Sequence, residues 1–563
     1  MSKILILLIV IFVGFAWLTP NHIFPWVTSH SEFSIFLALL LLFLYTVKNN
    51  KVIFLYKKNC IFFIIGSVPL IQYFFDKIFF LGDACIAILY IFGFIITLTI
   101  GNNLGKDELT RENSFSIFSY VVLGVALISI LLQSYQLFSL NINTIYMAEM
   151  PPNGRPFANF GQPNTLATFL VFAIFSVLYL YERYKIGVFV CVLVISIILF
   201  GIVLTQSRTP WVFAIFFLIW WFWKAKKSNL RIKTNGIFWG YAIYIFLLYL
   251  MPFISDYLLL SFSTVQQRAT TGFQRLDMWQ QMLIAIKNEP WLGYGWQQVS
   301  VAQVENTQFY PNTGWTEHSH NIILDLLIWN GIPLGFLIIF LIAWWLSQFI
   351  DLAHNIENFL FLSLTGALLV HGMLEYPLEY AFLLLPVGFL LGLIQVSSIN
   401  YQLNNSCKNS FVAVPRYLNI ILPILFFSIY ILILKEYRVI EKDAQQARYE
   451  ALNIGTLYAQ HRAPDVLVLT QLQAQIALMR TQPNPHMSEE EIEFVKRVTY
   501  RYATKAALIR YSQVLALNGH KEEALKHIDI IEKMYQEKIN YEALLSVDES
   551  LAFMWKTSEN ENE

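Results

Sequence analysis

The stretch Thr316-Glu-His-Ser-His-Asn-Ile-Ile-Leu-Asp-Leu-Leu-Ile-Trp-Asn-Gly-Ile-Pro-Leu-Gly335 takes the chain from a polar loop into an apolar helix. The apolar run that starts here continues far enough to cross a membrane, which needs about 20 residues. His318 and His320 stand just before it, and histidine is the side chain whose ordinary pKa lets it exchange a proton near neutral pH. The stretch therefore predicts a membrane helix that begins beside a general base. Two polar caps at a membrane interface are the simpler alternative.

The composition of the whole chain is that of a membrane protein. Of its 563 residues, 56% are hydrophobic and 16% aromatic, while only 13% are charged. The mean hydropathy is +0.53, far above the range of soluble proteins. The formal net charge is zero, so no nucleic-acid partner is expected. The four cysteines form no CxxC pair, and neither a disulfide framework nor a zinc site is predicted.

Apolar runs long enough to span a bilayer recur along most of the chain. They fall near 3–19, 32–47, 59–76, 79–100, 116–140, 164–181, 187–204, 209–223, 236–256, 321–348, 357–374, 380–397 and 417–435. We therefore predict an all-α polytopic membrane protein with about 13 transmembrane helices. The first run follows Lys3 as in a signal peptide, but it lacks a small-residue cleavage site and is expected to stay as a helix.

The loops between these runs divide by charge. Most Lys and Arg fall on one side, which the positive-inside rule makes cytoplasmic. The stretches predicted to face the other side are 141–163, 205–209, 257–320, 375–379 and everything after about residue 436. Arg155 and Arg208 are exceptions on that outer side. Binding an anion is one reason for such an arginine, and a side chain that reaches from the membrane to its surface is another.

Two domains are expected. Residues 1–435 are expected to form a transmembrane domain with 257–320 as its large outer loop, and residues 436–563 an outer helical domain; the family resemblance described below implies that the first is catalytic and that the outer side is the periplasm. Helical patterns in the second domain fall at 436–453, 465–480, 488–517 and 520–537. The stretch Tyr511 to Tyr535 is similar to one tetratricopeptide unit, and an ordinary helical hairpin explains it equally well.

Three outer segments carry groups suited to binding. The loop from Met150 to Asn164 is rich in Pro, Gly and Asn, which impose turns, and a purely structural re-entrant turn is its alternative reading. The run Phe273 to Lys287 predicts an interfacial helix that buries a Leu/Trp stripe and holds Arg275 near the headgroups. Finally, Glu375 to Tyr380 predicts a tight turn with two carboxylates and two phenols.

These motifs resemble a known family. The loop Arg155-Pro-Phe-Ala-Asn-Phe-Gly-Gln-Pro-Asn164, the Arg275…Trp279…Pro290-Trp-Leu-Gly-Tyr-Gly295 stretch, and His320-Asn321 followed after nine residues by Gly331 are similar to the PglL-type bacterial protein O-oligosaccharyltransferases. That group belongs to the O-antigen ligase and polymerase superfamily. The resemblance covers most of the membrane part and includes a helical periplasmic tail. One departure is Leu334, where the family pattern has a small residue or tyrosine, with Gly335 one position later.

The resemblance implies an activity and a set of roles. Such enzymes lie in the bacterial inner membrane and move a preassembled glycan from undecaprenyl pyrophosphate to Ser or Thr of a periplasmic protein, commonly a type IV pilin. The implied partners are this lipid-linked donor, the acceptor protein and membrane lipids. The implied site residues are His320 as the base, Arg208 and Arg275 for pyrophosphate, and Gln162, Asn164, Arg155, Tyr376, Tyr380 and His318 for glycan or acceptor.

The implied mechanism is a single displacement. His320 takes the proton of the acceptor hydroxyl, the two arginines offset the charge of the leaving pyrophosphate, and the configuration inverts without metal or other cofactor. A ligase to lipid A core or a glycan polymerase would share this chemistry. A transporter is a further alternative, and it would use charges within the spans, of which Asp83 and Asp325 are the candidates.

Overall fold

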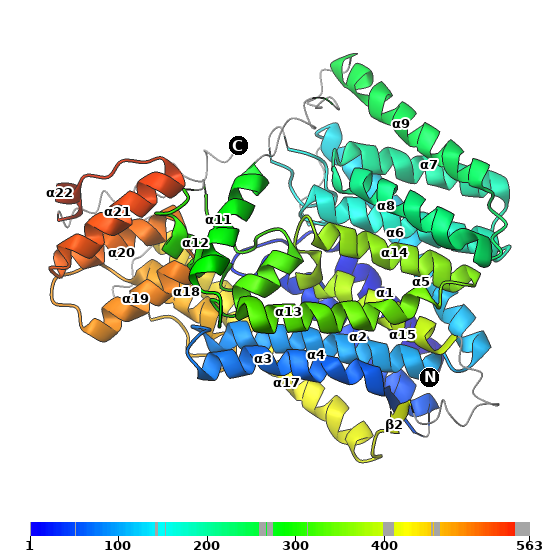
Figure 1. Cartoon of the computed structure of the whole chain (residues 1–563), viewed down its shortest axis with the longest axis horizontal. Coiled ribbons are helices and arrows are strands. Elements are labelled where there is room, and N and C mark those ends of the chain that lie inside the picture. The colour runs from blue at the N-terminus through cyan, green and yellow to red at the C-terminus, as the bar shows by residue number, and fades with distance from the viewer. Residues whose placement is uncertain are drawn as a thin grey trace. The chain divides into compact units, whose positions relative to one another are not determined.

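The computed structural model describes residues 2–50, 52–140, 145–151, 154–257, 266, 274–311, 314–397, 410–451, 454 and 462–545. Helices dominate these residues (Figure 1). The helices of the membrane part are α1 (Ser2–Leu18), α2 (Ser29–Asn49), α3 (Ile61–Phe74), α4 (Leu81–Leu104), α5 (Glu108–Leu137), α6 (Pro163–Glu182), α7 (Val188–Leu204), α8 (Thr209–Lys224), α9 (Thr234–Tyr257), α13 (Ile322–Ile350), α14 (Ile356–Gly372), α15 (Ala381–Ser397) and α17 (Leu418–Ala451). Between α9 and α13 lie α11 (Gln274–Asn288) and α12 (Val299–Asn306). After α17 come α18 (Thr470–Arg480), α19 (Glu489–Arg501), α20 (Lys505–Leu517), α21 (Lys521–Tyr535) and α22 (Tyr541–Leu544).

Every predicted apolar run is a helix in the structure. Seven helices of the described residues are long and apolar enough to cross a membrane, namely α2, α4, α5, α6, α9, α13 and α17. Shorter apolar helices include α1, α7, α14 and α15. The prediction of a helical multi-pass membrane protein is thus confirmed, while the number of spans stays a prediction.

A small sheet was not predicted. The strands β1 (Phe54–Tyr56) and β2 (Phe411–Ala413) pair antiparallel, with Leu55 opposite Val412. Asn103 holds β1 from the side: its Oδ1 accepts from Phe54 N at 3.0 Å and its Nδ2 donates to Phe54 O at 2.8 Å. Three residues per strand are too few to show an alternating pattern, and the partners lie far apart in sequence. This ladder was therefore invisible to periodicity.

The chain forms two compact units. The first contains residues 1–63, 90–271 and 342–430, and the second contains residues 64–89, 272–341 and 431–563. The division falls inside α3, α4, α13 and α17, so it does not follow the predicted boundary at residue 435. The predicted domains stay a prediction.

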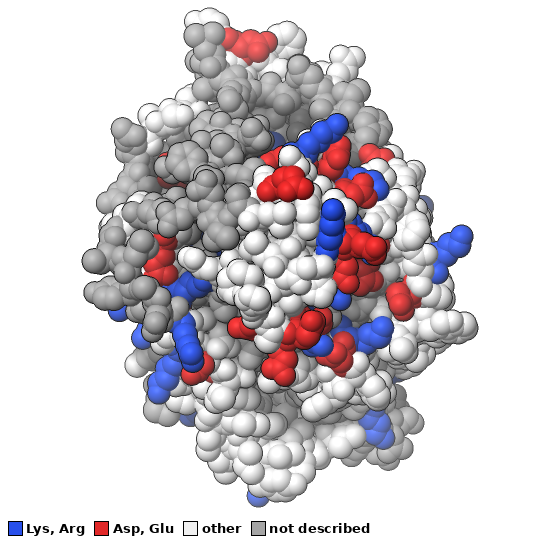
Figure 2. All heavy atoms as spheres, turned by 90° about the vertical axis from the view of Figure 1, so that its left-hand side faces the viewer, with Lys and Arg blue, Asp and Glu red and all other residues white. Residues whose placement is uncertain are grey.

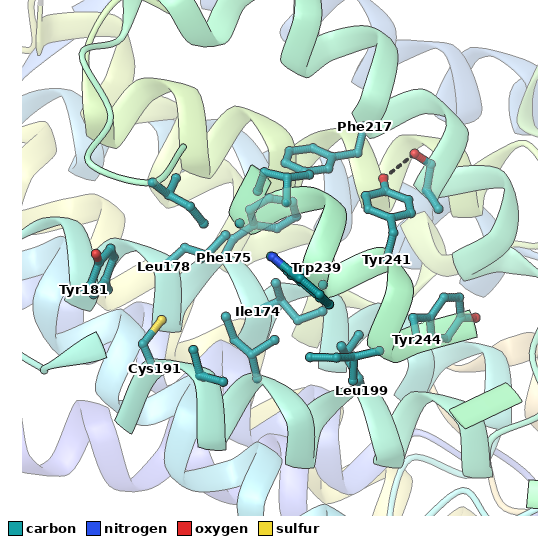
Figure 3. Close-up of a pocket in the computed structure, with 18 of the residues that line it drawn as sticks. Ile174, Phe175, Leu178, Tyr181, Cys191, Leu199, Phe217, Trp239, Tyr241 and Tyr244 are labelled. Carbon is teal, nitrogen blue, oxygen red and sulfur yellow. Dashed lines mark hydrogen bonds between the residues drawn. The ribbon is translucent and has the colours of Figure 1, made fainter. Parts of the chain in front are cut away.

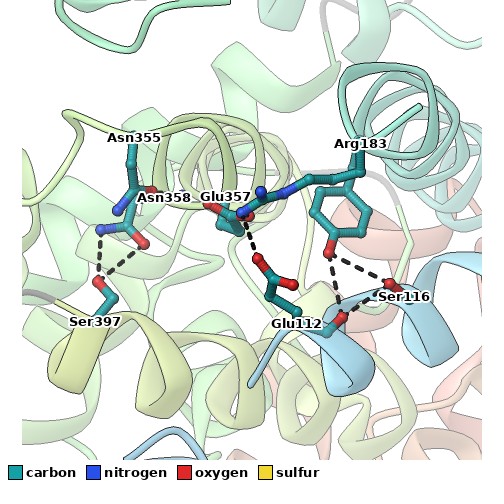
Figure 4. A network of polar contacts seen from close by, with 8 residues as sticks. Glu112, Ser116, Arg183, Asn355, Glu357, Asn358 and Ser397 are labelled. Carbon is teal, nitrogen blue, oxygen red and sulfur yellow. Dashed lines mark hydrogen bonds and ion pairs between the residues drawn. The ribbon is translucent and has the colours of Figure 1, made fainter. Parts of the chain in front are cut away.

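In the first unit, α6 is the central helix. It packs against α5, α7, α8 and α14, and nearly all its side chains are buried. Its end is tied by a polar network: Arg183, its C-cap residue, pairs with Glu112 of α5 at 3.1 Å and with Glu357 of α14 (Figure 4). Asn358 in α14 donates to Ser397 of α15 at 2.8 Å. These contacts join the ends of four helices at the side predicted to be cytoplasmic.

In the second unit, the helices after α17 carry mixed charges. Figure 2 shows acidic and basic side chains interspersed on the face that these helices form, as on a soluble domain. Helices α20 and α21 pack against each other across a turn at Gly519, with φ of 85°, so the predicted hairpin is confirmed. Its kinship to tetratricopeptide units stays a prediction.

Two of the helix boundaries predicted for the residues after α17 were wrong. The pattern at 488–517 predicted one helix, but α19 ends at Arg501 and α20 begins at Lys505, because Thr504 caps the second helix by accepting from Ala507 N at 3.3 Å. The pattern at 465–480 predicted a helix that starts too early. Val468 and its neighbours instead donate their amides to the Glu436 carboxylate, and α18 follows at Thr470.

Candidate active site

The loop before α13 is folded by its own polar side chains. Asn321 caps the helix, since its Oδ1 accepts from Ile323 N at 3.0 Å. Ser319 is completely buried between two neighbours: its amide donates to Asp325 Oδ1 at 2.8 Å, and its carbonyl accepts from Trp279 Nε1 of α11 at 2.9 Å. The loop is therefore held at a defined position on both sides of His320.

His320 adopts an unusual backbone conformation in this loop. Its φ is 55°, in the left-handed region that side chains other than glycine rarely adopt. Such strain persists where surrounding contacts enforce it, and it clusters at functional sites. The side chain is partly exposed and interacts electrostatically with Asp325, which is 1% exposed. This histidine combines access to a substrate with a nearby carboxylate.

His318 has a different environment. It is 7% exposed, and its backbone is held by Thr316, whose hydroxyl donates to His318 O at 2.6 Å. Burial lowers the pKa of His318 well below its ordinary range, and the charges of His320 and Arg501 lower it further. A buried neutral imidazole is poorly placed to meet an acceptor hydroxyl. This difference favours His320 as the base.

Helix α11 was predicted correctly, but its apolar stripe is divided. Of the predicted stripe, Ile286 is buried and Trp279 is partly buried, whereas Leu276 and Leu283 are 49% and 56% exposed. The structure thus buries part of the predicted stripe within the protein. Arg275 lies in the first turn and is partly exposed. Its predicted depth at headgroup level stays a prediction.

Two motif glycines explain the bend in α13. Gly331 has φ of 70° and ψ of 177°, which breaks the helix. The backbone carbonyls freed by this break accept from the loop that follows α11, with Tyr294 N donating to Ile328 O at 2.8 Å. A Cβ on Gly331 would lie 2.5 Å from Trp291 backbone atoms, and one on Gly293 would lie 2.4 Å from Gly331 N. Gly335, one position after the departure at Leu334, is also tightly packed. It is buried, and a Cβ added there would lie 2.9 Å from a carbonyl oxygen across the break.

In the first unit, side-chain amides hold the loop before α6 in place through hydrogen bonds to backbone groups. Asn159 Nδ2 donates to Leu18 O at 2.7 Å, and its Oδ1 accepts from Ala148 N at 2.9 Å. Gln136 of α5 pairs with the Ala158 backbone through its Nε2 and Oε1, at 2.9 and 2.7 Å. The reading of this loop as a structural turn thus holds for Asn159.

Asn164 joins three predicted outer segments. Its Nδ2 donates to Glu375 Oε1 at 2.8 Å, and its Oδ1 accepts from Ser207 Oγ at 2.7 Å. Arg155, in the loop that precedes Asn164, donates from Nη1 to Gln206 O at 3.4 Å. The segments around 155–164, 205–208 and 375 therefore meet. Their meeting agrees with the predicted topology, which put all three on one side.

The other predicted residues of the first unit lie at element ends. Arg208 is the N-cap residue of α8 and is partly exposed. Gln162 is the N-cap residue of α6, and its Oε1 accepts from Thr165 Oγ1 at 3.0 Å. Tyr376 and Tyr380 flank the predicted turn, now a 3₁₀ turn at Pro377–Glu379, with their rings edge to face at 5.8 Å. Burial raises the pKa of Tyr380 well above its ordinary range, and Tyr376 raises it further.

An apolar cavity of about 750 Å³ lies between α6, α7, α8 and α9 (Figure 3). Pro210, two residues after Arg208, lines one part of it, and Arg231 lines another. Tyr241 of α9 donates to Ala214 O of α8 at 2.6 Å, a bond drawn in Figure 3. Arg231 is anchored near the end of α6, since its amide donates to Glu182 at 2.7 Å. The walls suit a hydrocarbon chain.

The predicted site residues are divided between the two units. Arg155, Gln162, Asn164, Arg208, Tyr376 and Tyr380 belong to the first, and Arg275, His318 and His320 belong to the second. Among the residues that the structure describes, no group of three or more His, Cys, Asp and Glu side chains could hold a metal ion. The prediction that transfer needs no metal or cofactor stays a prediction.

Several residues around the histidines were missed or assigned no role. Trp279, which binds the loop carbonyl, was predicted only as part of a motif and of the apolar stripe. Asp83 and Asp325 were considered only as relay carboxylates of a transporter, and Arg501 was not considered at all. The two aspartates are polar groups in apolar runs, which is a usable signal, but the partner of each residue named here lies elsewhere in the sequence. Only the fold identifies that partner.

Comparison with known protein families gives the general class of this protein. Residues 193–340 match the family model described as O-antigen ligase, and residues 359–543 match one described as the C-terminal part of a virulence factor membrane-bound polymerase. The first range includes Arg208, Arg275 and His320. The chain is thus a helical membrane protein, part of which is similar to O-antigen ligases.

Two relatives from Acinetobacter baylyi (strain ATCC 33305 / BD413 / ADP1) narrow the family to which the chain belongs. The general O-oligosaccharyltransferase is 31% identical over 561 residues, which cover 98% of this chain and 96% of the relative. The ComP-specific O-oligosaccharyltransferase is 33% identical over 406 residues, 70% of this chain and 72% of the relative. The chain belongs to the bacterial O-oligosaccharyltransferase family. The resemblance stated from sequence motifs is confirmed.

Proposed function

We propose that the chain transfers a preassembled oligosaccharide from undecaprenyl pyrophosphate to a Ser or Thr hydroxyl of a periplasmic protein, with a type IV pilin as the expected acceptor. The observation that carries the proposal is the identity to a general O-oligosaccharyltransferase along almost the whole of both chains. The protein then lies in the bacterial inner membrane. Its outer loops and the part after residue 436 face the periplasm.

His320 is the proposed base. It removes the acceptor proton while the hydroxyl oxygen attacks the anomeric carbon, and the bond from that carbon to the pyrophosphate oxygen breaks. One displacement of this kind inverts the configuration. The partial exposure of His320 and its electrostatic interaction with the buried Asp325 support this role. Undecaprenyl pyrophosphate leaves, and the glycan remains on the protein.

The arginines and the apolar cavity are assigned to the donor. Arg208 and Arg275 offset the charge that grows on the leaving pyrophosphate, which suits their planar, permanently charged guanidiniums. The polyprenyl chain lies in the cavity between α6 and α9, whose lining includes Pro210, two residues after Arg208. Gln162, Arg155 and the tyrosines Tyr376 and Tyr380 keep the proposed role of orienting glycan or acceptor. Asn164 contributes by holding their segments together.

The test is glycan occupancy of an acceptor pilin, measured by intact-protein mass spectrometry in cells at matched membrane levels of each variant. We expect His320→Ala to abolish occupancy and His318→Ala to retain it. Normal occupancy with both variants would remove the base assignment. No occupancy with the unaltered protein would remove the pilin as acceptor.

A second function has one specific observation in its favour. The match of residues 193–340 to the O-antigen ligase model fits a lipid A core acceptor or a glycan polymerase equally well in chemical terms. Deletion of the protein would then change the length or presence of O-antigen on lipopolysaccharide gels. An unchanged lipopolysaccharide pattern supports the protein acceptor.

A further inference from the structure

The end of α19 lies against the beginning of the histidine loop, and both belong to the second unit. Trp315 Nε1 donates to Ser300 Oγ of α12 at 2.9 Å, and that hydroxyl donates to Tyr500 O at 2.7 Å. The rings of Trp315 and Tyr502 meet edge to face, with centroids 6.3 Å apart. The helices that follow the membrane part therefore contact the loop at Trp315, three residues before His318 and five before His320.

A buried ion pair lies at the same place. Arg501, the last residue of α19, is 6% exposed, and Asp83, in the first turn of α4, is 3% exposed. Arg501 donates through Nε and Nη2 to the two Asp83 oxygens at 3.1 and 3.0 Å. Its Nη1 is buried and lacks a hydrogen-bond partner among the described residues. Such a pair costs desolvation energy, so it is weak evidence for stability and leaves room for another role.

The guanidinium also acts on the loop. Burial raises the pKa of Glu317, and Arg501 offsets part of that rise while Asp83 adds to it. Arg501 likewise contributes to the lowered pKa of His318, after burial and His320. The charge of Arg501 thus bears on the pKa of both groups, and its two hydrogen bonds to Asp83 fix the position of the guanidinium.

We propose that Arg501 is a positioning residue for His320: its ion pair with Asp83 holds the end of α19, where Tyr502 packs on Trp315, against the loop that carries the histidine. The inference rests on the proposed function, because it takes His320 as the base. A base must lie within about 2.6–3.2 Å of the proton that it removes, and a misplacement of about 1 Å can cost a factor of roughly 100 in rate. The C-terminal helices then form part of the catalytic apparatus.

The chain contains a matched control four residues earlier in α19. Arg497 donates to Asp76 at 2.8 and 2.9 Å, but this pair is solvent-exposed. Arg501→Gln and Arg497→Gln are compared as full-length proteins in nanodiscs at equal folded amounts, with lipid-linked glycan and pilin. We expect Arg501→Gln to lower kcat by about 10- to 100-fold without raising either KM. We expect Arg497→Gln to leave both constants unchanged, because exposed pairs contribute little.

A double variant separates positioning from stability. Asp83→Leu with Arg501→Met replaces the pair by apolar groups, which often preserves or increases stability. We expect the thermal midpoint to recover relative to Arg501→Gln while kcat stays low. Recovery of kcat, or equal rates for Arg501→Gln and Arg497→Gln, would overturn the inference. Absence of transfer by the unaltered protein would instead remove the proposed function itself.

Discussion

Asn164 donates a hydrogen bond to Glu375 across 2.8 Å, although the two residues lie 211 positions apart in the chain. Both side chains are buried, at 8% and 3% exposed, and Asn164 also accepts from Ser207 at 2.7 Å. A residue predicted to bind glycan is thus the junction of the segments that carry the other candidates. A substitution of Asn164 is therefore expected to lower activity by weakening the contacts that hold these segments together.

Asn164→Leu should destabilise the protein. It removes two buried hydrogen bonds, to Glu375 and from Ser207, at a cost of about 1 kcal/mol for each. The measurement is the thermal midpoint of the purified protein by size-exclusion detection of folded material. Gln162→Leu is the control, because Gln162 is partly exposed and makes only a local bond to Thr165. Equal midpoints for the two variants would contradict the prediction.

The buried His318 should make stability depend on pH. Its folded pKa is lowered from the ordinary value of 6.5, mainly by burial, so only the unfolded state takes up the proton near that pH. The stability linked to His318 is therefore fully present above about pH 6.5 and falls below it, by up to about 1.4 kcal/mol per pH unit. His318→Asn removes this contribution, and its midpoint should approach that of the unaltered protein as the pH falls from 7.5 to 5.5.

His354→Asn, which alters an exposed histidine, controls for loss of a ring elsewhere. A constant difference in midpoint between His318→Asn and the unaltered protein across this pH range would argue against a buried neutral imidazole. The comparison uses differences between variants, so titration of other groups cancels.

The cavity between α6 and α9 allows a test with little effect on folding. Gly240 lines the cavity, and a Cβ there meets no atom within 4 Å. Gly240→Phe should raise the KM for a long polyprenyl donor by roughly 10-fold, since displacing two methylene groups costs about 1.6 kcal/mol. A donor with a short isoprenoid chain should be unaffected.

Gly124→Phe is the matched control, because Gly124 in α5 also meets no atom within 4 Å and does not line the cavity. An equal loss with long and short donors would mean that Gly240→Phe acts through the fold. An unchanged KM with both donors would mean that the chain lies elsewhere.

Gly331 should not tolerate a side chain. Gly331→Ala places a Cβ 2.5 Å from the Trp291 backbone, and its φ of 70° alone costs about 1–3 kcal/mol for a residue other than glycine. We expect a lower thermal midpoint and reduced transfer, because the same bend sets the path of the helix that follows His320. Gly14→Ala in α1, where a Cβ meets nothing within 4 Å, should leave both unchanged. A tolerated Gly331→Ala would show that the bend can relax.

The positions of the helices were predictable because each follows from local composition. Long apolar runs must become helices in a bilayer, where every backbone amide needs an internal partner. The exceptions are instructive. Thr504 split a helical pattern by capping, and the amides before Thr470 bound Glu436 instead of entering a helix. Both depend on one polar side chain whose partner periodicity does not identify.

The features of the candidate site also fall into those that the sequence predicts and those that only the fold reveals. The sequence by itself determined the class of protein, the apolar helices, and the motif residues His320, Arg208 and Arg275, because hydropathy and motif spacing are properties of neighbouring residues. Only the tertiary structure decided that His318 is buried while His320 is partly exposed, that Asn164 joins Ser207 to Glu375, and that Arg501 pairs with Asp83. Burial and ion pairing depend on residues hundreds of positions away, which meet only when the helices pack.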